Sequence, residues 1–211
     1  MTAMILQSSS CCNVLHAQAI VAPTGVSASS TAVGAPINLG DQSGLSATYI
    51  STVTLFDLFL STTTHDQNSN SNAWASGDNT NEFIDFDFGE SIDLTRLALF
   101  ADDSPNGNNI QDFSVLISND PTFATSTNLG SFTASDTNPN PITAQVYDVL
   151  DGSGQFVRLL LTDNHGGDFG FDSFVLGEAI FEGTSSAVPE PSSFLMIAGL
   201  CIGVLVRRNR T

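Results

Sequence analysis

The chain has 211 residues, a length that suits one domain with short appendages rather than two large domains. It carries 22 acidic residues against five arginines and no lysine, which gives a formal net charge of −17 at pH 7. Because such a chain repels phosphate backbones, nucleic-acid binding is excluded, and the chain lacks a cationic patch for anionic lipids. Hydrophobic residues make up 41% and 15 residues are phenylalanine, so the composition also excludes a disordered chain.

The N-terminal residues predict an atypical signal peptide over residues 1–19. Ala17-Gln18-Ala19 has the small-x-small pattern of a signal-peptidase site, which predicts cleavage after Ala19. The preceding stretch has no lysine or arginine, and Ser8-Ser9-Ser10 and Asn13 interrupt its apolar run. One hypothesis is that the true basic region of the signal peptide lies upstream of the given start.

The expected exported body, residues 20–187, contains short runs in which apolar and polar residues alternate. In residues 84–88, for example, apolar residues alternate with Asp85 and Asp87, as in a strand with one buried face. No window has a sustained helical period, and Gly, Asn, Asp and Pro separate the runs. Six or more such strands at roughly even spacing predict an all-β protein with a β-sandwich or jelly-roll fold. The predicted strands include residues 84–88, 97–99, 113–118, 156–161 and 176–181.

Several short segments of the body occur in a familiar order. Phe113–Ser118 with the turn Asn119-Asp120 and, later, Phe156–Leu159 are similar to a strand, a turn and an aromatic-Val-Arg-Leu strand of discoidin-like domains, also called coagulation-factor type C or galactose-binding-like domains. This resemblance implies a jelly-roll β-sandwich. The sequence departs from the family pattern at Gln42, where glycine is common, and at Phe88, where leucine is usual. The other matching segments are Asn38–Ser46, Trp74 with Phe83–Gly89, Asn164–Gly167 and Leu176–Gly183.

Two arrangements of acidic residues suit calcium, which prefers oxygen ligands. Many sugar-binding members of the discoidin-like family hold a structural calcium between an early-loop aspartate and a closing-strand glutamate, so the resemblance implies a site at Asp41 and Glu178. Residues 102–107 also match the first half of an EF-hand loop, although Phe113 stands where the closing glutamate would be. An ordinary solvated hairpin loop is the alternative for residues 102–107.

The body has few residues that suit catalysis. It contains no cysteine, because Cys11 and Cys12 lie in the expected signal peptide and Cys201 lies in the C-terminal segment. It has no hydrolase-type Ser-His-Asp spacing, and the absence of lysine removes Schiff-base chemistry. Asp85 and Asp87 are interpreted as the solvated face of a strand rather than as the paired acids of a glycoside hydrolase. We therefore expect a protein that is not an enzyme.

Five residues in predicted loops have the side-chain chemistry of a carbohydrate site, which combines an aromatic face with amide and imidazole hydrogen bonds. They are His65, Asn72, Asn164, His165 and Phe169. The sequence alone does not bring these residues together. Two further residues are expected to have structural roles, Trp74 in the core and Arg158 as the partner of a strand carboxylate.

The C-terminal residues combine an extended proline segment, a short apolar run and a basic cluster. Val188-Pro189-Glu190-Pro191 precedes an uninterrupted apolar run from Phe194 to Val206, and Arg207 and Arg208 follow the run directly. The run predicts one short hydrophobic helix of roughly 20 Å, less than the ~30 Å hydrocarbon core of a bilayer. The arginines would stay on the cytoplasmic side and hold the body outside.

This combination resembles the PEP-CTERM sorting signal of Gram-negative bacteria and assigns residues 188–211 to a sorting tail. The resemblance implies recognition and cleavage by an exosortase-type membrane enzyme. It also implies export, with anchoring in the inner membrane through residues 194–206 before processing and a cell-surface or extracellular location afterwards. Such tails are associated with strains that make extracellular polysaccharide.

The sequence therefore predicts an exported, exosortase-sorted, non-catalytic protein whose β-sandwich binds a glycan or an exopolysaccharide matrix. One alternative is a purely structural surface or biofilm protein whose acidity confers solubility and calcium-mediated cross-linking. A secreted glycan-active enzyme is a third hypothesis.

Overall fold

The computed structural model describes residues 18–66, 72–77, 81–102, 107–136, 141–166 and 173–185. The C-terminal hydrophobic helix expected over residues 194–206 lies outside the described residues, as does most of the expected signal peptide. Among the described residues, no helix is both long enough and apolar enough to cross a membrane.

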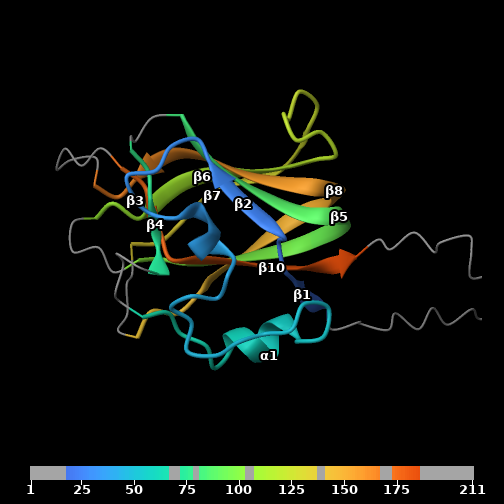
Figure 1. Ribbon diagram of the computed structural model, residues 1–211, viewed down its shortest axis with the longest axis horizontal. Helices are drawn as coiled ribbons and strands as arrows, with labels where there is room; N and C mark the ends of the chain where they lie inside the picture. Colours follow the sequence, from blue (N-terminus) through green and yellow to red (C-terminus); the bar gives the residue numbers. More distant parts are fainter. Residues whose placement is uncertain are drawn as a thin grey trace, which may run out of the picture.

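The described residues form two β-sheets, and the short helices η1 and α1 lie in the connections (Figure 1). The larger sheet has seven strands in the order β1-β10-β5-β8-β6-β7, with β2 paired to β5, and the smaller sheet has the order β3-β4-β9. All-β architecture, predicted from the alternating runs, is thereby confirmed. The elements are β1 (Ala19–Val21), β2 (Gly25–Ala28), β3 (Val33–Gly34), η1 (Pro36–Leu39), α1 (Phe56–Leu60), β4 (Trp74–Ala75), β5 (Glu82–Phe100), β6 (Ile110–Ser118), β7 (Thr127–Thr133), β8 (Gln145–Asn164), β9 (Val175–Leu176) and β10 (Glu178–Ser185).

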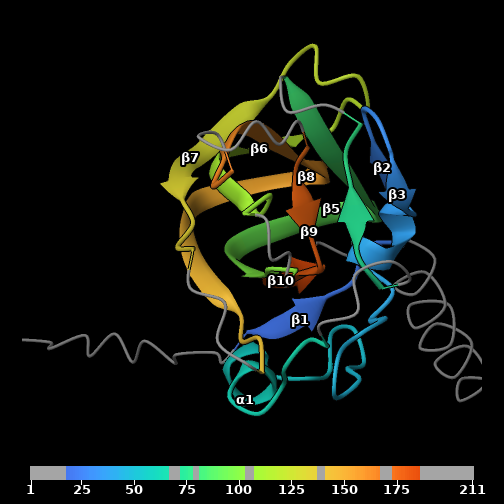
Figure 2. The ribbon, with the colours of Figure 1, turned by 90° about the vertical axis from the view of Figure 1, so that its left-hand side faces the viewer.

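The long strands β5 and β8 bend the large sheet around the main core (Figure 2). The first half of β5 pairs with β2 and the second half pairs with β10, and a register shift separates the halves between Asp87 and Ile92. Phe86 in the first half therefore meets Phe181 of β10 across the core, with ring centroids 4.7 Å apart. The alternation predicted two separate strands at residues 84–88 and 97–99, whereas the structure has one bent strand.

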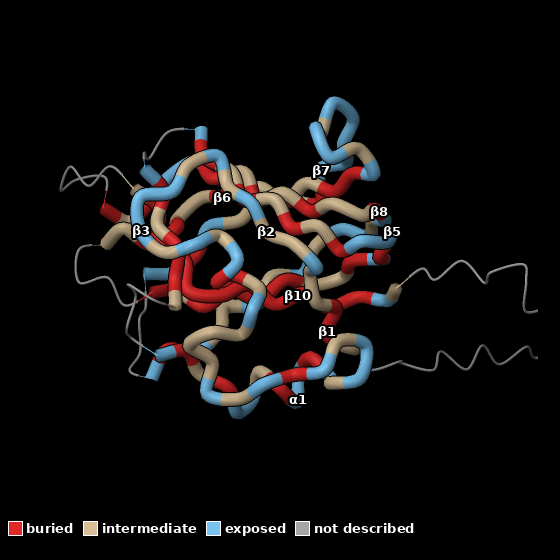
Figure 3. The backbone as a smooth tube through the Cα atoms, viewed as in Figure 1, coloured by how far each residue is buried: buried red, intermediate tan, exposed pale blue. Residues whose placement is uncertain are grey.

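A second hydrophobic cluster lies on the other side of β10 and the second half of β5. It is formed where α1 and the preceding loop cover that side of the sheet, with Phe56 and Phe59 packed near Phe100 and Ile180. Because both sides of β10 are covered, almost the whole strand is buried, as the colouring in Figure 3 shows. Trp74 is completely buried in the main core and its indole N–H donates to Ser30 O at 3.2 Å, which confirms its predicted core role.

The outer side of the β5–β8 pair carries one ion pair. Arg158 donates to both carboxylate oxygens of Asp85, at 2.6 and 2.7 Å, which confirms the predicted partnership with a strand carboxylate. The guanidinium group also lies over the rings of Phe83 and Phe123, 3.8 and 4.2 Å from their centroids. Opposite charge, bidentate geometry and ring stacking together satisfy this cation on every side.

Both ends of the described body leave the sandwich at one place. Ala19, the first residue of β1, pairs with Gly183 near the end of β10, so the first and last described strands meet at this edge of the sheet. β10 runs from Glu178 to Ser185, so its two ends are separated by roughly 23 Å at ~3.3 Å per residue. The end of the sandwich near Glu178 is therefore remote from the point where the chain leaves the fold.

Candidate functional site

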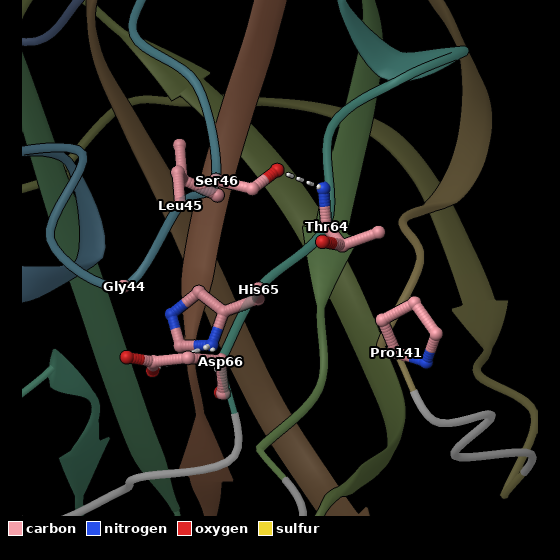
Figure 4. A pocket seen from close by; sticks show the side chains of 7 residues that line it. All are labelled: Gly44, Leu45, Ser46, Thr64, His65, Asp66 and Pro141. Atoms are coloured by element: carbon pink, nitrogen blue, oxygen red, sulfur yellow. Dashed lines mark hydrogen bonds and ion pairs between the residues drawn. The ribbon is translucent and has the colours of Figure 1, made fainter.

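Three chain segments build a pocket at the end of the sandwich near Glu178. The backbone N–H of Ser46 donates to Thr64 O at 2.8 Å, that of Asp66 donates to Gly44 O at 2.8 Å, and that of His65 donates to Ile142 O at 3.0 Å. These bonds hold together loops that are distant in the sequence and enclose a cavity of about 520 Å³ (Figure 4). Gly44, Leu45, Ser46, Thr64, His65, Asp66 and Pro141 line the cavity.

His65 occupies a niche between two glycines. The side chain is buried, and a Cβ atom on Gly44 would lie 2.6 Å from Nε2, while one on Gly177 would lie 2.9 Å from Cε1. Only glycine at both positions leaves room for the ring. Nδ1 lies 2.7 Å from Asp66 O, a pure acceptor, so in the neutral ring the hydrogen is on Nδ1 and Nε2 is left as an acceptor. Nε2 has no hydrogen-bond partner.

Asn72 joins His65 at the same niche. Its Nδ2 donates to Asp66 Oδ2 at 2.9 Å, and a Cβ on Gly44 would lie 3.0 Å from Asn72 Cβ. The structure thus brings two of the five predicted glycan-site residues together around Gly44 and Asp66. Gly44, Asp66 and Gly177 were missed by the sequence reasoning. Their only sequence mark is that Gly44 and Gly177 lie in segments that resemble the discoidin-like pattern.

Asn164 and His165 belong to a second loop cluster. The Asn164 amide is used within its own loop, because Nδ2 donates to Ser173 O at 2.6 Å and Oδ1 accepts from Gly166 N at 3.1 Å. The backbone N–H of His165 donates to Asn109 O at 3.1 Å. Several buried side-chain atoms here have no partner, namely His165 Nε2, Asn108 Oδ1, and both Nδ2 and Oδ1 of Asn109. The fifth predicted residue, Phe169, lies outside the described residues.

The segment 175–177 lies between the two clusters. The backbone N–H of Val175 donates to Asn108 O at 2.9 Å, and two residues later Gly177 closes the niche around His65. The two clusters therefore adjoin at one end of the sandwich. Of the four predicted glycan-site residues that the structure describes, His65 lines the pocket and Asn72 contacts the lining residue Asp66. The other two lie in the second cluster.

Glu178 follows Gly177 directly and is buried with an unsatisfied oxygen. Its Oε1 accepts from the backbone N–H of Gln42 at 3.3 Å, while Oε2 has no partner. Burial, with a smaller contribution from the nearby charge of Asp41, raises the pKa of Glu178 to about 9, and the Gln42 bond opposes this shift. The same two carboxylates and, above all, burial raise the pKa of Tyr49. Asp41 is exposed, and its Oδ1 accepts from Ser43 N at 2.8 Å.

These groups fit a hard cation. Glu178 Oε2, Tyr49 Oη and Ser43 Oγ are buried oxygens without partners close to a second carboxylate, and calcium prefers an all-oxygen shell. Within the described ranges, no cluster of three or more His, Cys, Asp or Glu side chains suits a metal. Asp41 and Glu178 would therefore supply the charged ligands, and hydroxyl groups, backbone carbonyls or water would supply the rest. The other predicted calcium loop, residues 102–107, is described only in part. Asp102 is buried, and residues 103–106 lie outside the described residues.

The chain belongs to the F5/8 type C domain family, which matches residues 60–171, just over half of the chain. Residues 187–210 match the PEP-CTERM protein-sorting motif, which indicates export and sorting to the cell surface or the extracellular space. Both resemblances predicted from the sequence are confirmed. No curated protein matches the chain.

Solved structures of carbohydrate-binding modules have the same fold. The chain is similar to the CBM32 of AlyQ in complex with 4,5-unsaturated mannuronic acid, with 18% identity and a TM-score of 0.52 over 77% of this chain and 96% of that chain. It is similar to a CBM32 from Clostridium perfringens in complex with GalNAc-β-1,3-galactose, with 11% identity and a TM-score of 0.53 over 74% and 93% of the two chains.

A third similar structure is a variant of chitosan-binding module 1 from a chitosanase/glucanase of Paenibacillus sp. IK-5, with 17% identity and a TM-score of 0.53 over 79% and 99%. At these identities the likeness establishes the β-sandwich fold. Carbohydrate-binding modules are a non-catalytic kind of domain.

Proposed function

We propose that the chain is an exported, non-catalytic surface or matrix protein that binds a glycan in the pocket between Gly44 and Pro141. The pocket itself carries this proposal. Its volume of about 520 Å³ suits a small sugar, and its lining offers carboxylate and hydroxyl groups beside short apolar surfaces, with the buried His65 ring behind the wall. Similar folds include modules solved with a mannuronic acid derivative and with GalNAc-β-1,3-galactose, which supports a glycan as the ligand class.

The position of the pocket supports presentation of the glycan site away from the membrane. β10 begins at Glu178, beside the pocket, and ends at Ser185, from which the chain continues towards the sorting motif. A body tethered after Ser185 therefore directs its pocket outwards. We assign processing to an exosortase-type enzyme that cuts at Pro189-Glu190-Pro191, directly before the apolar run. Replacing these three residues by alanine should leave the tail uncleaved, as judged by intact mass.

Calcium has a supporting role in this proposal. Asp41 and Glu178 would hold the ion at the start of the loop that continues through Gly44 and Ser46 into the pocket wall. A cation at this position would satisfy Glu178 Oε2 and fix the loop, so that the pocket wall is ordered before the sugar arrives.

A glycan array with the purified protein tests the proposed function. We expect binding to a restricted set of glycans, and at least about tenfold weaker binding for His65→Ala and Asn72→Ala. Thr127→Ala is the matched control, because Thr127 is exposed at the end of β6–β7 remote from the pocket. If the array shows no binding to any glycan in the presence of calcium, the protein is better explained as a structural surface protein.

A further inference from the structure

The described pocket lining contains a carboxylate and no cation. Asp66 is half exposed, with 50% of its side chain accessible, and its Oδ2 accepts from Asn72. Ser46 Oγ accepts from Thr64 N at 2.9 Å. The imidazole of His65 is buried behind Gly44, so its Nε2 is not exposed to the pocket. The one charged group that the described lining presents to the pocket is therefore an acceptor, the carboxylate of Asp66.

No arginine is free to serve the pocket in the part of the chain that the structure describes. This part contains two arginines, and both are already paired. Arg96 donates to Glu182 Oε1 at 2.7 Å and to Asp57 Oδ2 at 2.9 Å, and Arg158 is bound bidentately by Asp85. Neither arginine lines the pocket. A bound carboxylate or sulfate group would therefore find no cationic partner here.

The charge around the pocket has the same sign as the charge of Asp66. Asp41 lies at the start of the loop that leads into the pocket wall, and the whole chain has a formal net charge of −17. A uronic acid residue carries only acceptors on its charged group, whereas a protonated amino sugar carries three N–H donors and a positive charge. The first is mismatched in both charge and hydrogen bonding, and the second is matched in both.

We propose that the pocket selects glycans with free amino groups, such as oligomers of glucosamine, over N-acetylated and uronic acid glycans. This inference rests on the proposed function, because it names the ligand class of the same site. Asp66 is the selecting residue, since it is the exposed carboxylate of the lining and Asn72 fixes its orientation. An ammonium group about 4 Å from an exposed carboxylate gains about fivefold in affinity in water.

Three hexasaccharide probes test the inference by calorimetry, namely glucosamine, N-acetylglucosamine and mannuronate hexamers. We expect the glucosamine hexamer to bind about fivefold more tightly than the N-acetylated hexamer, with the mannuronate hexamer weakest. Asp66→Asn keeps an oxygen that can accept from Asn72, so the pocket shape is retained. This variant should lose the amine preference, so that it binds the glucosamine and N-acetylglucosamine hexamers within about twofold of each other.

A charge-matched control distinguishes a specific contact at Asp66 from the non-specific attraction of a polycation to an acidic protein. Asp151→Asn removes the same charge at an exposed position of β8 outside the pocket, and it should keep the full amine preference. Equal losses in the two variants, or tightest binding of the mannuronate hexamer, would overturn the inference. If none of the hexamers binds while other glycans on the array do, the inference fails and the proposed function stands. If nothing binds on the array either, the proposed function itself fails.

Discussion

The surroundings of Arg158 and Glu178 differ in how completely each buried ionisable group is satisfied. On the outer side of the β5–β8 pair, Arg158 has a bidentate carboxylate, Asp85, and two aromatic rings. At the loop end, Glu178 is more deeply buried, yet one of its oxygens has no partner and its closest charged neighbour, Asp41, has the same sign. Arg158, Asp85, Phe83 and Phe123 thus form a closed cluster, in which both charges have partners. Glu178, Asp41, Tyr49 and Ser43 form an open cluster, in which buried oxygens have no partner.

This difference separates the parts of the molecule that hold the fold from the parts that suit a ligand. A buried polar group without a hydrogen-bond partner is costly, so it persists only where other interactions hold the backbone around it. Here the enforcing structure is the second half of β5, to which Glu178 is paired at Phe100. The sheet therefore holds Glu178 in place although the neighbouring loop leaves its Oε2 without a partner, and a bound cation would supply that partner.

Breaking the closed cluster should have the largest effect on stability. Arg158→Met leaves Asp85, whose side chain is 16% exposed, mostly buried and unpaired. We expect the free energy of unfolding to fall by about 3 kcal/mol, because breaking a buried ion pair strands the remaining charge. Urea denaturation followed by the fluorescence of the single tryptophan measures this change.

A double variant tests whether the stranded charge is the cause. Asp85→Leu combined with Arg158→Met removes both charges, and it should recover most of the stability lost in the single variant. If the double variant is as unstable as Arg158→Met alone, the stacking of Arg158 on the two phenylalanine rings is more important than the ion pair.

In the presence of a chelator, the open cluster should make the free energy of unfolding depend on pH. Glu178 keeps its proton up to about pH 9 in the folded protein, whereas its ordinary pKa is 4.5. Between these values the folded chain binds one proton more than the unfolded chain, so the free energy of unfolding falls as pH rises. The slope is up to about 1.4 kcal/mol per pH unit. Glu178→Gln should remove this part of the slope, as measured by urea denaturation between pH 6 and pH 8.

Calcium should bind to Asp41 and Glu178 of the open cluster and stabilise the folded protein. Millimolar calcium should raise the melting temperature of the parent more than magnesium at equal ionic strength, with a larger gain at pH 8 than at pH 6, because the ion displaces a proton. Asp41→Ala and Glu178→Ala should remove the difference between the two metals. Equal effects of calcium and magnesium on the parent would rule out a specific site at Asp41 and Glu178.

The strands that carry the closed cluster were largely predictable from the sequence, whereas the pocket and the open cluster beside it were not. Alternation along residues 84–88 and 156–161 indicates which side of each strand is buried, and an arginine on the polar side of one strand suits a carboxylate on the next. Strand alternation depends only on neighbouring residues, so it can be recognised in one sequence without knowledge of the fold. The joining of residues 84–88 and 97–99 into one strand depends on pairing with β10 and β8. The local mark at the register shift is Gly89, with a φ of +75°, and a glycine there is equally typical of a turn between two strands.

The pocket depends on contacts between segments that are far apart in the chain. Gly44 and Gly177 are separated by more than a hundred residues, and only the fold reveals that both leave room for one imidazole. The resemblance to discoidin-like domains predicted Asp41 and Glu178 as calcium ligands, which stays a prediction; both residues lie beside the same loop. It did not predict that Asn164 would use its amide to hold its own turn rather than face a ligand.

The smallest predicted effect concerns Gln42, the residue at which the sequence departs from the family's usual glycine. Gln42 has a φ of +68°, a left-handed conformation that costs a non-glycine residue about 1 kcal/mol. Its side chain offsets this cost, because Oε1 accepts from Tyr49 N at 2.8 Å and Nε2 donates to Tyr49 O at 3.4 Å. These bonds hold the loop beside Glu178 in place of the conformational freedom that glycine would provide.

Two substitutions separate the strain from the hydrogen bonds. Gln42→Ala loses both bonds and keeps the strained φ, whereas Gln42→Gly loses the bonds but relieves the strain. We therefore expect both variants to be less stable than the parent, with alanine worse than glycine by about 1 kcal/mol in urea denaturation. Gln111 in β6 is the matched control, because its φ is not positive and the order should reverse there, with glycine worse than alanine. If glycine is also worse than alanine at position 42, the left-handed conformation is not a cost that the Tyr49 bonds offset, and the loop beside Glu178 is held by other contacts.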